Sequence, residues 1–317
     1  MNRKNIFIVA GISMIVIISL ISLIMSYLAF KGRKNIQQVV VKVEPETYKI
    51  FIPAVPDKLD FCGEQVPLND IDVKERIERE LFVNAYWYSS TILALKRANR
   101  WFPVIEPILK KYGIPDDFKY LAVIESNLSN VVSNAGAVGF WQLMEAAAKK
   151  YGLEVNKEVD ERYNVEKSTE AACKYLREAY SKYKSWTLAA ASYNYGMNGI
   201  DMQINRQRTK NYYNLFLNTE TYRFVARILA MKEIMTNPEK YGYYLKKEDL
   251  YQPIETNEII VKSSINNLAS FAEKHGINYK ILKLLNPWLR ADYLPNKSNK
   301  IYVIKIPKGK EYYLLDE

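Results

Sequence analysis

Apolar residues recur every three or four positions over most of residues 59–250, which is the spacing of helices that bury one face. We expect helices at residues 71–98 (as one or two helices), 101–112, 115–128, 146–151, 168–183, 186–193 and 218–235. Pro103 and Pro107 are expected to make the second segment irregular, and Ser168 is expected to begin the fifth. The succession predicts a mainly α-helical domain.

The pattern changes towards the C-terminus. Residues 258–262 and 301–306 have the composition of strands, and two short helical segments lie between them. We expect the helix caps at Ser263 or Ser264 and at Asn278. This order predicts a small β-α-α-β module at residues 257–307. Because residues 252–257 have the composition of a linker, we expect the module to be separable from the helical domain.

The N-terminal segment carries a long apolar run. Ile6 to Phe30 are 25 residues without a charge, and a cluster of basic residues follows. Such a run is long enough to cross a bilayer and longer than the apolar core of a cleaved signal peptide. We therefore expect a transmembrane signal anchor at residues 1–34, with an unusually long signal peptide as the alternative. Positive charges flank both ends, so the run does not decide its orientation. Residues 35–58 are expected to form a stalk.

One glutamate lies in apolar surroundings. The helix expected from Pro115 carries Leu121, Ile124 and Leu128 at helical spacing, and Glu125 lies among these apolar residues. A carboxyl group in such surroundings has a raised pKa, which suits a general acid at neutral pH. The alternative is a Glu on the solvated face of an amphipathic helix, which is the commoner case.

Three short motifs follow one another along the chain. They are Glu125-Ser126, Gly136-x-x-Gly139-x-x-Gln142 and Ala191-x-Tyr193-Asn194-x-Gly196. In this order they resemble the motifs of lytic murein transglycosylases of the soluble-lytic, goose-lysozyme-like superfamily. The resemblance extends over about residues 59–243. It implies a lysozyme-like α-helical catalytic domain, which we place at residues 59–250.

The resemblance implies a reaction without water. Enzymes of this family cleave the β-1,4 bond between N-acetylmuramic acid and N-acetylglucosamine and close a 1,6-anhydro ring on the muramyl residue. One Glu protonates the glycosidic oxygen and then takes the proton of the muramyl C6 hydroxyl, while the muramyl N-acetyl group stabilises the developing cation. Matched motif by motif, Glu125 is this catalytic residue. The residues expected to bind substrate are Ser126, Ser133, Gln142, Tyr193, Asn194 and Glu220. Ser126 and Ser133 are alternatively expected to orient Glu125.

The sequence departs from the family pattern at three places. Phe140-Trp141 replaces the commoner Leu-Met of the glycine loop, and Met197-Asn198 follows the third motif where small residues are usual. The C-terminal module resembles a LysM carbohydrate-binding module, but Asn266-Asn267 stands near the place of its usual Gly-Asp. The module is therefore either a glycan-binding module or a structural appendage.

Two other classes of protein remain open. A goose-lysozyme-like hydrolase would use the same Glu together with an acid that activates water. A non-catalytic peptidoglycan-binding protein is the alternative that involves no enzyme, and the intact Glu125-Ser126 and glutamine loop argue against it.

Charge narrows the choice of partner. The chain of 317 residues has a formal net charge of +10, which favours an anionic partner unless it reflects lysine-rich composition alone. Peptidoglycan glycan strands carry carboxylates, and with the membrane they are the partners that we expect. Nucleic acid is not expected, since no known nucleic-acid-binding motif occurs.

The sequence contains no cluster of metal ligands, and the lone His275 is interpreted as structural, so we expect no metal and no cofactor. The expected location is the cell envelope, with the catalytic domain in the periplasm.

Two cysteines occur, Cys62 and Cys173. In an oxidising compartment a disulfide between them would fasten the start of the domain to the helix at Cys173. The alternative is two separately buried thiols.

Overall fold

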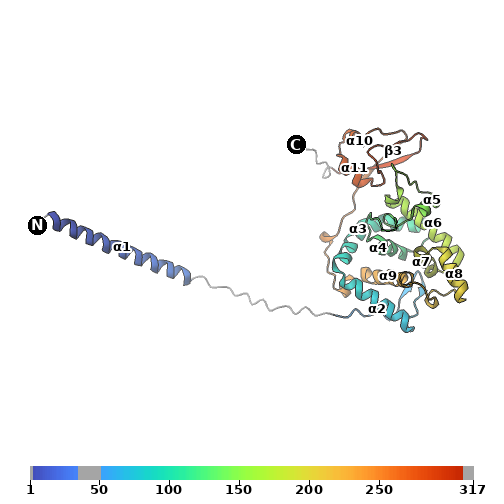
Figure 1. The fold of residues 1–317 in the computed structure, drawn as a ribbon, viewed down its shortest axis with the longest axis horizontal. Helices are drawn as coiled ribbons and strands as arrows, with labels where there is room; N and C mark the ends of the chain where they lie inside the picture. Colours follow the sequence, from blue (N-terminus) through green and yellow to red (C-terminus); the bar gives the residue numbers. More distant parts are fainter. Residues whose placement is uncertain (1–2, 35–50, 310–317) are drawn as a thin grey trace. The chain divides into compact units, whose positions relative to one another are not determined.

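The computed structural model describes residues 3–34 and 51–309 (Figure 1). It divides into two compact units, Met1–Phe51 and Ile52–Glu317, and each is described by itself. The first contains helix α1 (Arg3–Lys34), whose side chains are described from Val16 to Lys31. Among the described residues, no helix is long and apolar enough to cross a membrane. The expected anchor lies partly outside the described side chains, and the expected stalk lies outside the described residues as far as residue 50.

Helices make up most of the second unit. Helix α9 (Thr219–Thr236) is a shared partner, because α2 (Ile71–Tyr86), α4 (Lys119–Ser126) and α7 (Trp186–Tyr195) all pack against it. Four further helices complete this body: α3 (Tyr88–Lys111), α5 (Glu145–Lys150), α6 (Val165–Tyr183) and α8 (Met197–Gln207) (Figure 1). The expectation of a mainly helical domain is confirmed.

Helix α3 corrects the expected boundaries. The helical conformation is interrupted at Trp87, and α3 then runs without a break from Tyr88 to Lys111 with Pro103 and Pro107 inside it. The buried face of α3 continues past Pro103, through Ala94, Ala98, Ile105 and Leu109. Packing of this face outweighs the local cost of two prolines, which the apolar pattern alone could not reveal.

Helix α6 begins at Val165, so the cap expected at Ser168 is wrong. The side chain of Asn164 accepts a hydrogen bond from the backbone N–H of Lys167 at 2.9 Å, as an N-cap residue does. Ser168 is buried one turn inside the helix, with its hydroxyl 3.3 Å from Val165 O. Helix α8, which follows the third motif directly, was not expected from the apolar pattern.

A hairpin fastens the start of the domain to α7. It consists of β1 (Asp60–Phe61) and β2 (Glu64–Gln65). The carboxylate of Glu64 accepts hydrogen bonds from the backbone N–H of Thr187 at 3.0 Å and from its hydroxyl at 2.8 Å. Anionic groups are favoured at the N-terminus of a helix, so this contact holds the helix that carries the third motif.

Cys62 and Cys173 are both free, so the expected disulfide is not formed. Cys62 lies in the hairpin turn with φ 55, and its N–H donates to Asp117 Oδ2 at 2.7 Å. Cys173 is buried on α6, where it contributes to the helical core. Burial raises the pKa of Cys173 to about 12 and raises that of Cys62 as well. The structure agrees with the alternative of two separate thiols, of which Cys173 is buried and Cys62 half-buried.

The C-terminal module has the expected β-α-α-β order. Strands β3 (Thr256–Val261) and β4 (Tyr302–Pro307) pair antiparallel, and α10 (Leu268–Lys274) and α11 (Tyr279–Leu285) lie between them in the chain. Asn278 caps α11 as expected, but Asn267 rather than Ser263 or Ser264 caps α10. The module has a core of its own, formed by Leu268, Leu282, Leu294 and Ile304.

The same core includes residues of the helical body. Val159 is 1% exposed among the module's core residues, and Tyr163 packs against them. An isolated β-bridge joins Val159 to Leu289. Apolar side chains from both parts therefore share one core, so the module contacts the helical body beyond the expected linker at residues 252–257, and its separability stays a prediction.

Candidate active site

Glu125 lies in the last turn of α4. The residues before it, Leu121, Ala122 and Val123, are buried against neighbouring helices. Asn127 then takes a left-handed conformation with φ 52 and ends the helix. Glu125 itself is only half-buried. Its carboxyl group is thus held by a buried helix yet reaches the surface.

The pKa of Glu125 is raised to about 7. Burial is the largest cause, because a charged carboxylate loses hydration there. The positive charge of Arg227 opposes the shift, and the negative charge of Glu220 adds to it. Arg227 also donates from Nη2 to Ile124 O at 2.9 Å, directly before Glu125. The expectation of a raised pKa is confirmed.

The glycine loop between α4 and α5 folds back on itself. Val138 forms isolated β-bridges with Val132 and with Leu143. Gly139 has φ +81, and a Cβ atom there would lie 2.1 Å from Arg162 O. Both the backbone conformation and the close approach require glycine at this position.

Ser126 and Ser133 both contact the glycine loop. Ser126 is buried, with its Oγ 2.8 Å from Phe140 O and 3.1 Å from Ala122 O. Ser133 Oγ accepts a hydrogen bond from the N–H of Ala137 at 3.0 Å. These contacts favour a role in shaping the loop over direct contact with a substrate.

Gln142 lies at the end of the loop with φ 45. Its Nε2 donates to Gly139 O at 2.8 Å and to Val131 O at 3.1 Å. Within residues 51–309 its Oε1 has no hydrogen-bond partner. The side chain is half-buried, so this oxygen is an acceptor available beside the loop.

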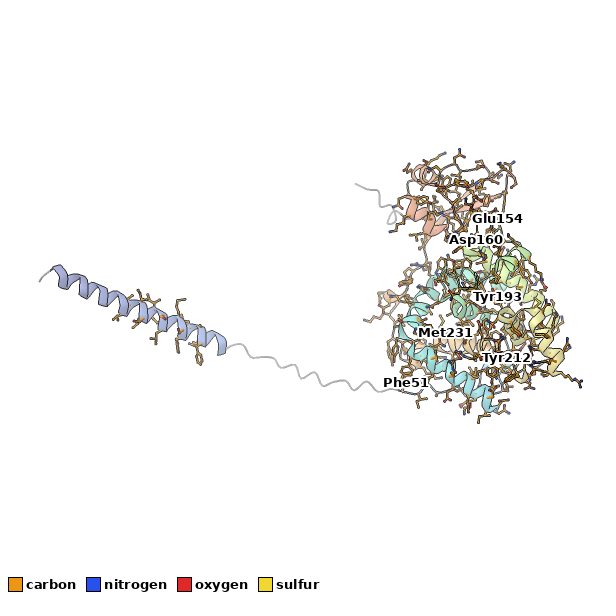
Figure 2. All side chains as sticks on the ribbon, viewed as in Figure 1. Phe51, Glu154, Asp160, Tyr193, Tyr212 and Met231 are labelled. Atoms are coloured by element: carbon orange, nitrogen blue, oxygen red, sulfur yellow. The ribbon has the colours of Figure 1, made fainter. Side chains whose placement is uncertain are left out.

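Helix α7 brings the third motif to the same place. Tyr193 OH donates to Trp141 O at 2.7 Å, so it grips the glycine loop (Figure 2 labels Tyr193 within the helical body). Burial raises the pKa of Tyr193 well above its usual value, and the charge of Glu125 adds to this effect. Asn194 donates from Nδ2 to Glu220 Oε1 at 3.0 Å and accepts from the Thr221 hydroxyl at 2.7 Å.

The structure thus unites α4, the glycine loop, α7 and α9 around Glu125. Sequence reasoning missed two arginines, Arg227 on α9 and Arg162 behind the glycine loop. Arg227 follows Glu220 by seven residues, which is two helical turns, so the helical period could have placed both on one face. No local pattern indicates the role of Arg162, because the loop carbonyls that it binds, Gly136 O and Leu143 O, lie 26 and 19 residues away in the sequence.

Two cavities of about 490 and 590 Å³ lie elsewhere, along α3. None of the motif residues lines either of them. We place the site at Glu125 rather than at a cavity because the polar groups converge there and the carboxyl pKa is strongly shifted there.

Two stretches of the chain match known family models. Residues 103–216 match the family model described as the Transglycosylase SLT domain, and residues 257–310 match the Soluble lytic transglycosylase C-terminal LysM-like domain. The chain therefore carries an SLT domain followed by a LysM-like domain, which confirms the resemblance found in the motifs.

Two curated relatives make the similarity more specific. The chain is 28% identical over 258 residues to Membrane-bound lytic murein transglycosylase D from each of two strains of Escherichia coli. The match covers 78% of this chain and 55% of each relative. The chain thus spans about half the length of the curated relatives it matches.

Proposed function

We propose that this protein is a peptidoglycan lytic transglycosylase, which cleaves the bond between N-acetylmuramic acid and N-acetylglucosamine without water and leaves 1,6-anhydro ends. The observation that carries the proposal is the half-buried Glu125 of the SLT domain, whose pKa is about 7. About half of such carboxyl groups hold a proton at neutral pH, so one group can serve as acid and then as base.

Glu125 gives its proton to the glycosidic oxygen as the bond breaks. The muramyl C6 hydroxyl then attacks the anomeric carbon, and its proton returns to Glu125, so the enzyme regains its starting state. Burial raises the pKa of Glu125 to about 7, and the charges of Arg227 and Glu220 act on it in opposite senses. This balance supports the double role of one carboxyl group.

The proposed substrate contacts are supported by the hydrogen bonds of the site. Gln142 accepts from an acetamido N–H through Oε1, because both of its amide hydrogens are engaged by loop carbonyls. Asn194 and Glu220, which are joined by a hydrogen bond, grip the glycan from α7 and α9. Tyr193 faces Glu125, while Ser126 and Ser133 act through the loop that they hold.

Hydrolysis in the manner of goose lysozyme is the second candidate function. Glu220 supports it, because this exposed carboxylate acts electrostatically on Glu125 and is a possible activator of water. The match of residues 103–216 to the Transglycosylase SLT domain favours the lyase. A protein that binds peptidoglycan without cleaving it is the third possibility, and digestion of murein tests it directly.

We also propose that the protein acts in the cell envelope, anchored by residues 1–34 and held away from the membrane by residues 35–58. The uncharged run from Ile6 to Phe30 within the single helix α1 supports the anchor. The catalytic domain would comprise residues 59–250 and the LysM-like module residues 257–307. Glycan binding by the module is part of this proposal.

Mass spectrometry of the products tests the chemistry. Purified murein is incubated with the protein, and the soluble muropeptides are examined. Muramyl ends of the lyase lack one water relative to those of the hydrolase, so the masses separate the two reactions. Release of reducing muramic ends would overturn the lyase in favour of hydrolysis, and no release at all would favour the non-catalytic protein.

A further inference from the structure

The segment between α5 and α6 is clamped by the LysM-like module. The backbone N–H of Asp160 donates to Trp288 O at 2.9 Å, and that of Arg290 donates to Glu158 O at 2.8 Å. Tyr293 OH donates to Glu158 Oε1 at 3.1 Å. Together with the shared core around Val159, these contacts fix the backbone of the segment to the module.

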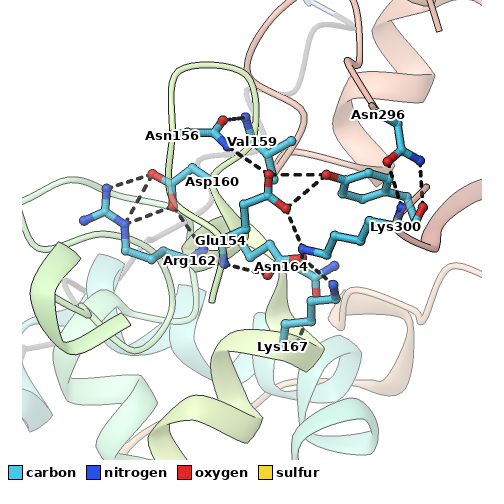
Figure 3. Close-up of polar contacts among 11 residues, drawn as sticks. Glu154, Asn156, Val159, Asp160, Arg162, Asn164, Lys167, Asn296 and Lys300 are labelled. Carbon is cyan, nitrogen blue, oxygen red and sulfur yellow. Dashed lines mark hydrogen bonds and ion pairs between the residues drawn. The ribbon is translucent and has the colours of Figure 1, made fainter. Parts of the chain in front are cut away.

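Side chains of β4 and its preceding turn strengthen the clamp (Figure 3). Lys300 pairs with Glu154 and lies 3.4 Å from Glu161 Oε1, and Tyr302 OH donates to Glu154 Oε2 at 3.0 Å. The Glu161 side chain is only 3% exposed, and Lys167 pairs with it from the helical body. One buried carboxylate is therefore shared by a lysine from each side of the interface.

The other side of this segment holds the glycine loop. The guanidinium of Arg162 donates to both oxygens of Asp160, at 2.9 and 2.7 Å, and both side chains are 9% exposed (Figure 3). Its remaining nitrogen, Nη1, lies 3.2 Å from Gly136 O and 3.3 Å from Leu143 O. Arg162 thus joins the two ends of the loop, and its own carbonyl lies against Gly139.

We propose that Arg162 is a positioning residue for the reaction at Glu125, and that the docked LysM-like module sets the geometry of the glycine loop through the segment that carries Arg162. The loop in turn contacts Ser126 through Phe140 O and Tyr193 through Trp141 O, which places it beside Glu125. The catalytic part of this inference rests on the proposed function. The structural coupling from module to loop does not.

The planar fork of Arg162 suits this task. It has enough donors to bind a carboxylate with two nitrogens while a third reaches the loop carbonyls, whereas lysine offers one nitrogen. Arg162→Lys keeps the positive charge beside Asp160 but cannot make both sets of contacts. The substitution therefore tests positioning without leaving a buried carboxylate unpaired.

Hydrogen exchange and kinetics of the full-length Arg162→Lys protein provide the first test. We expect the amides of Gly139 and Leu143, which donate to Val131 O and Val138 O, to exchange about tenfold faster. With a short soluble murein glycan we expect kcat to fall about tenfold, because a loosened loop misplaces the substrate over Glu125. KM should change less than kcat, and the pH midpoint should stay the same, since the charges that shift Glu125 lie on α9. Wild-type exchange or wild-type kcat in a folded Arg162→Lys protein would overturn the proposal.

A change on the module side provides the second test. Lys300→Ala removes a contact with Glu154 and Glu161, and exposed Lys297, three residues earlier, gives the matched control Lys297→Ala. We expect Lys300→Ala to speed exchange at Gly139 and Leu143 about threefold, and Lys297→Ala to leave it unchanged. When Lys300→Ala is combined with Arg162→Lys, the loss of kcat should be smaller than the product of the single losses, as for residues that act through one path.

Equal exchange in Lys300→Ala and Lys297→Ala would overturn the coupling, even if Arg162→Lys behaves as expected. The wild-type product separates this inference from the proposed function. If the wild-type protein releases no anhydro ends, the proposed function fails, while the exchange measurements still test the coupling. If it releases them and exchange is unaffected by both variants, only the inference fails.

Discussion

Glu125 in the helical body and Glu154 at the module interface are both partly buried, yet their pKa values move in opposite directions. Burial raises the pKa of Glu125 to about 7, and Arg227 offsets only part of this. Burial also acts upward on Glu154, but hydrogen bonds from Lys300, Tyr302 and Asn156 and the charge of Lys300 prevail and lower its pKa. The difference shows the effect of a hydrogen-bonded cation on a partly buried carboxyl group. Without such a partner the group has a raised pKa and can serve as a general acid, whereas with one it stays charged and joins two parts of the fold.

The two regions also differ in how they are held together. Around Glu125, hydroxyl and amide donors bind backbone carbonyls, such as Ser126 to Phe140 O and Tyr193 to Trp141 O. At the interface the contacts are lysine–glutamate pairs around a small apolar core. Salt screens exposed charges far more than neutral hydrogen bonds, so the contacts at the interface should respond to ionic strength more than these hydrogen bonds around Glu125.

The largest expected effect comes from Glu125→Gln. Loss of the general acid should lower cleavage of murein by about 10³-fold or more, since such groups contribute about 10²–10⁴-fold. Because folding raises the pKa of Glu125, its charge costs stability above pH 7 and none below the unfolded pKa, so the variant should melt at the same or a higher temperature at pH 8. Release of anhydro ends and thermal melting are the measurements, with exposed Glu75→Gln as control. Retention of more than a few per cent of the activity would remove Glu125 from the mechanism.

Gly139→Ala should have the next largest effect. Its Cβ would meet Arg162 O at 2.1 Å and φ is +81, so we expect a loss of about 1–3 kcal/mol in the free energy of unfolding. Gly136→Ala is a matched control, because Gly136 has φ +83 but nothing within 4 Å of the added Cβ. Urea unfolding and kcat compare the two variants. Equal losses would mean that backbone conformation alone matters and that contact with Arg162 does not.

Arg227→Gln should shift the pH dependence of cleavage. The active form has Glu125 protonated, so activity falls as pH rises through about 7. Removing the charge of Arg227, which lowers this pKa, should move the fall to higher pH. Glu220→Gln should move it to lower pH, because the charge of Glu220 raises the same pKa. Profiles of kcat/KM against pH measure these shifts. Shifts in the same direction for both variants would contradict the opposite effects of Arg227 and Glu220 on the pKa of Glu125.

The smallest effect is expected for Glu154→Gln. The variant should lose about 0.5–1 kcal/mol of stability at pH 7 and low salt, as for a partly exposed ion pair. Because folding lowers the pKa of Glu154, its contribution is present above the unfolded pKa and disappears as pH falls through the folded pKa. Wild type and variant should therefore converge in urea unfolding at acid pH and at high salt. A difference that persists in acid would show that shape rather than charge holds Glu154.

Much of the fold followed from local patterns in the chain. Helical spacing of apolar residues predicted most of the helices, although it missed α8 and the start of α3. Asn278 correctly predicted the start of α11, because a helix cap depends on neighbours in the sequence. The raised pKa of Glu125 was also foreseeable, since the apolar residues before it bury the same turn of α4. The order of three motifs predicted which segments would meet.

Tertiary structure alone decided the rest. Helix α3 continues through two prolines because its buried face is packed, and Cys62 and Cys173 are both free. The role of Arg227 depends on its contact with Ile124 O, and that of Arg162 on its contact with the glycine loop. The module packs on the helical body through Val159. Local sequence determines which face of an element is apolar. Only the packed chain determines which distant carbonyl, carboxylate or core that face meets.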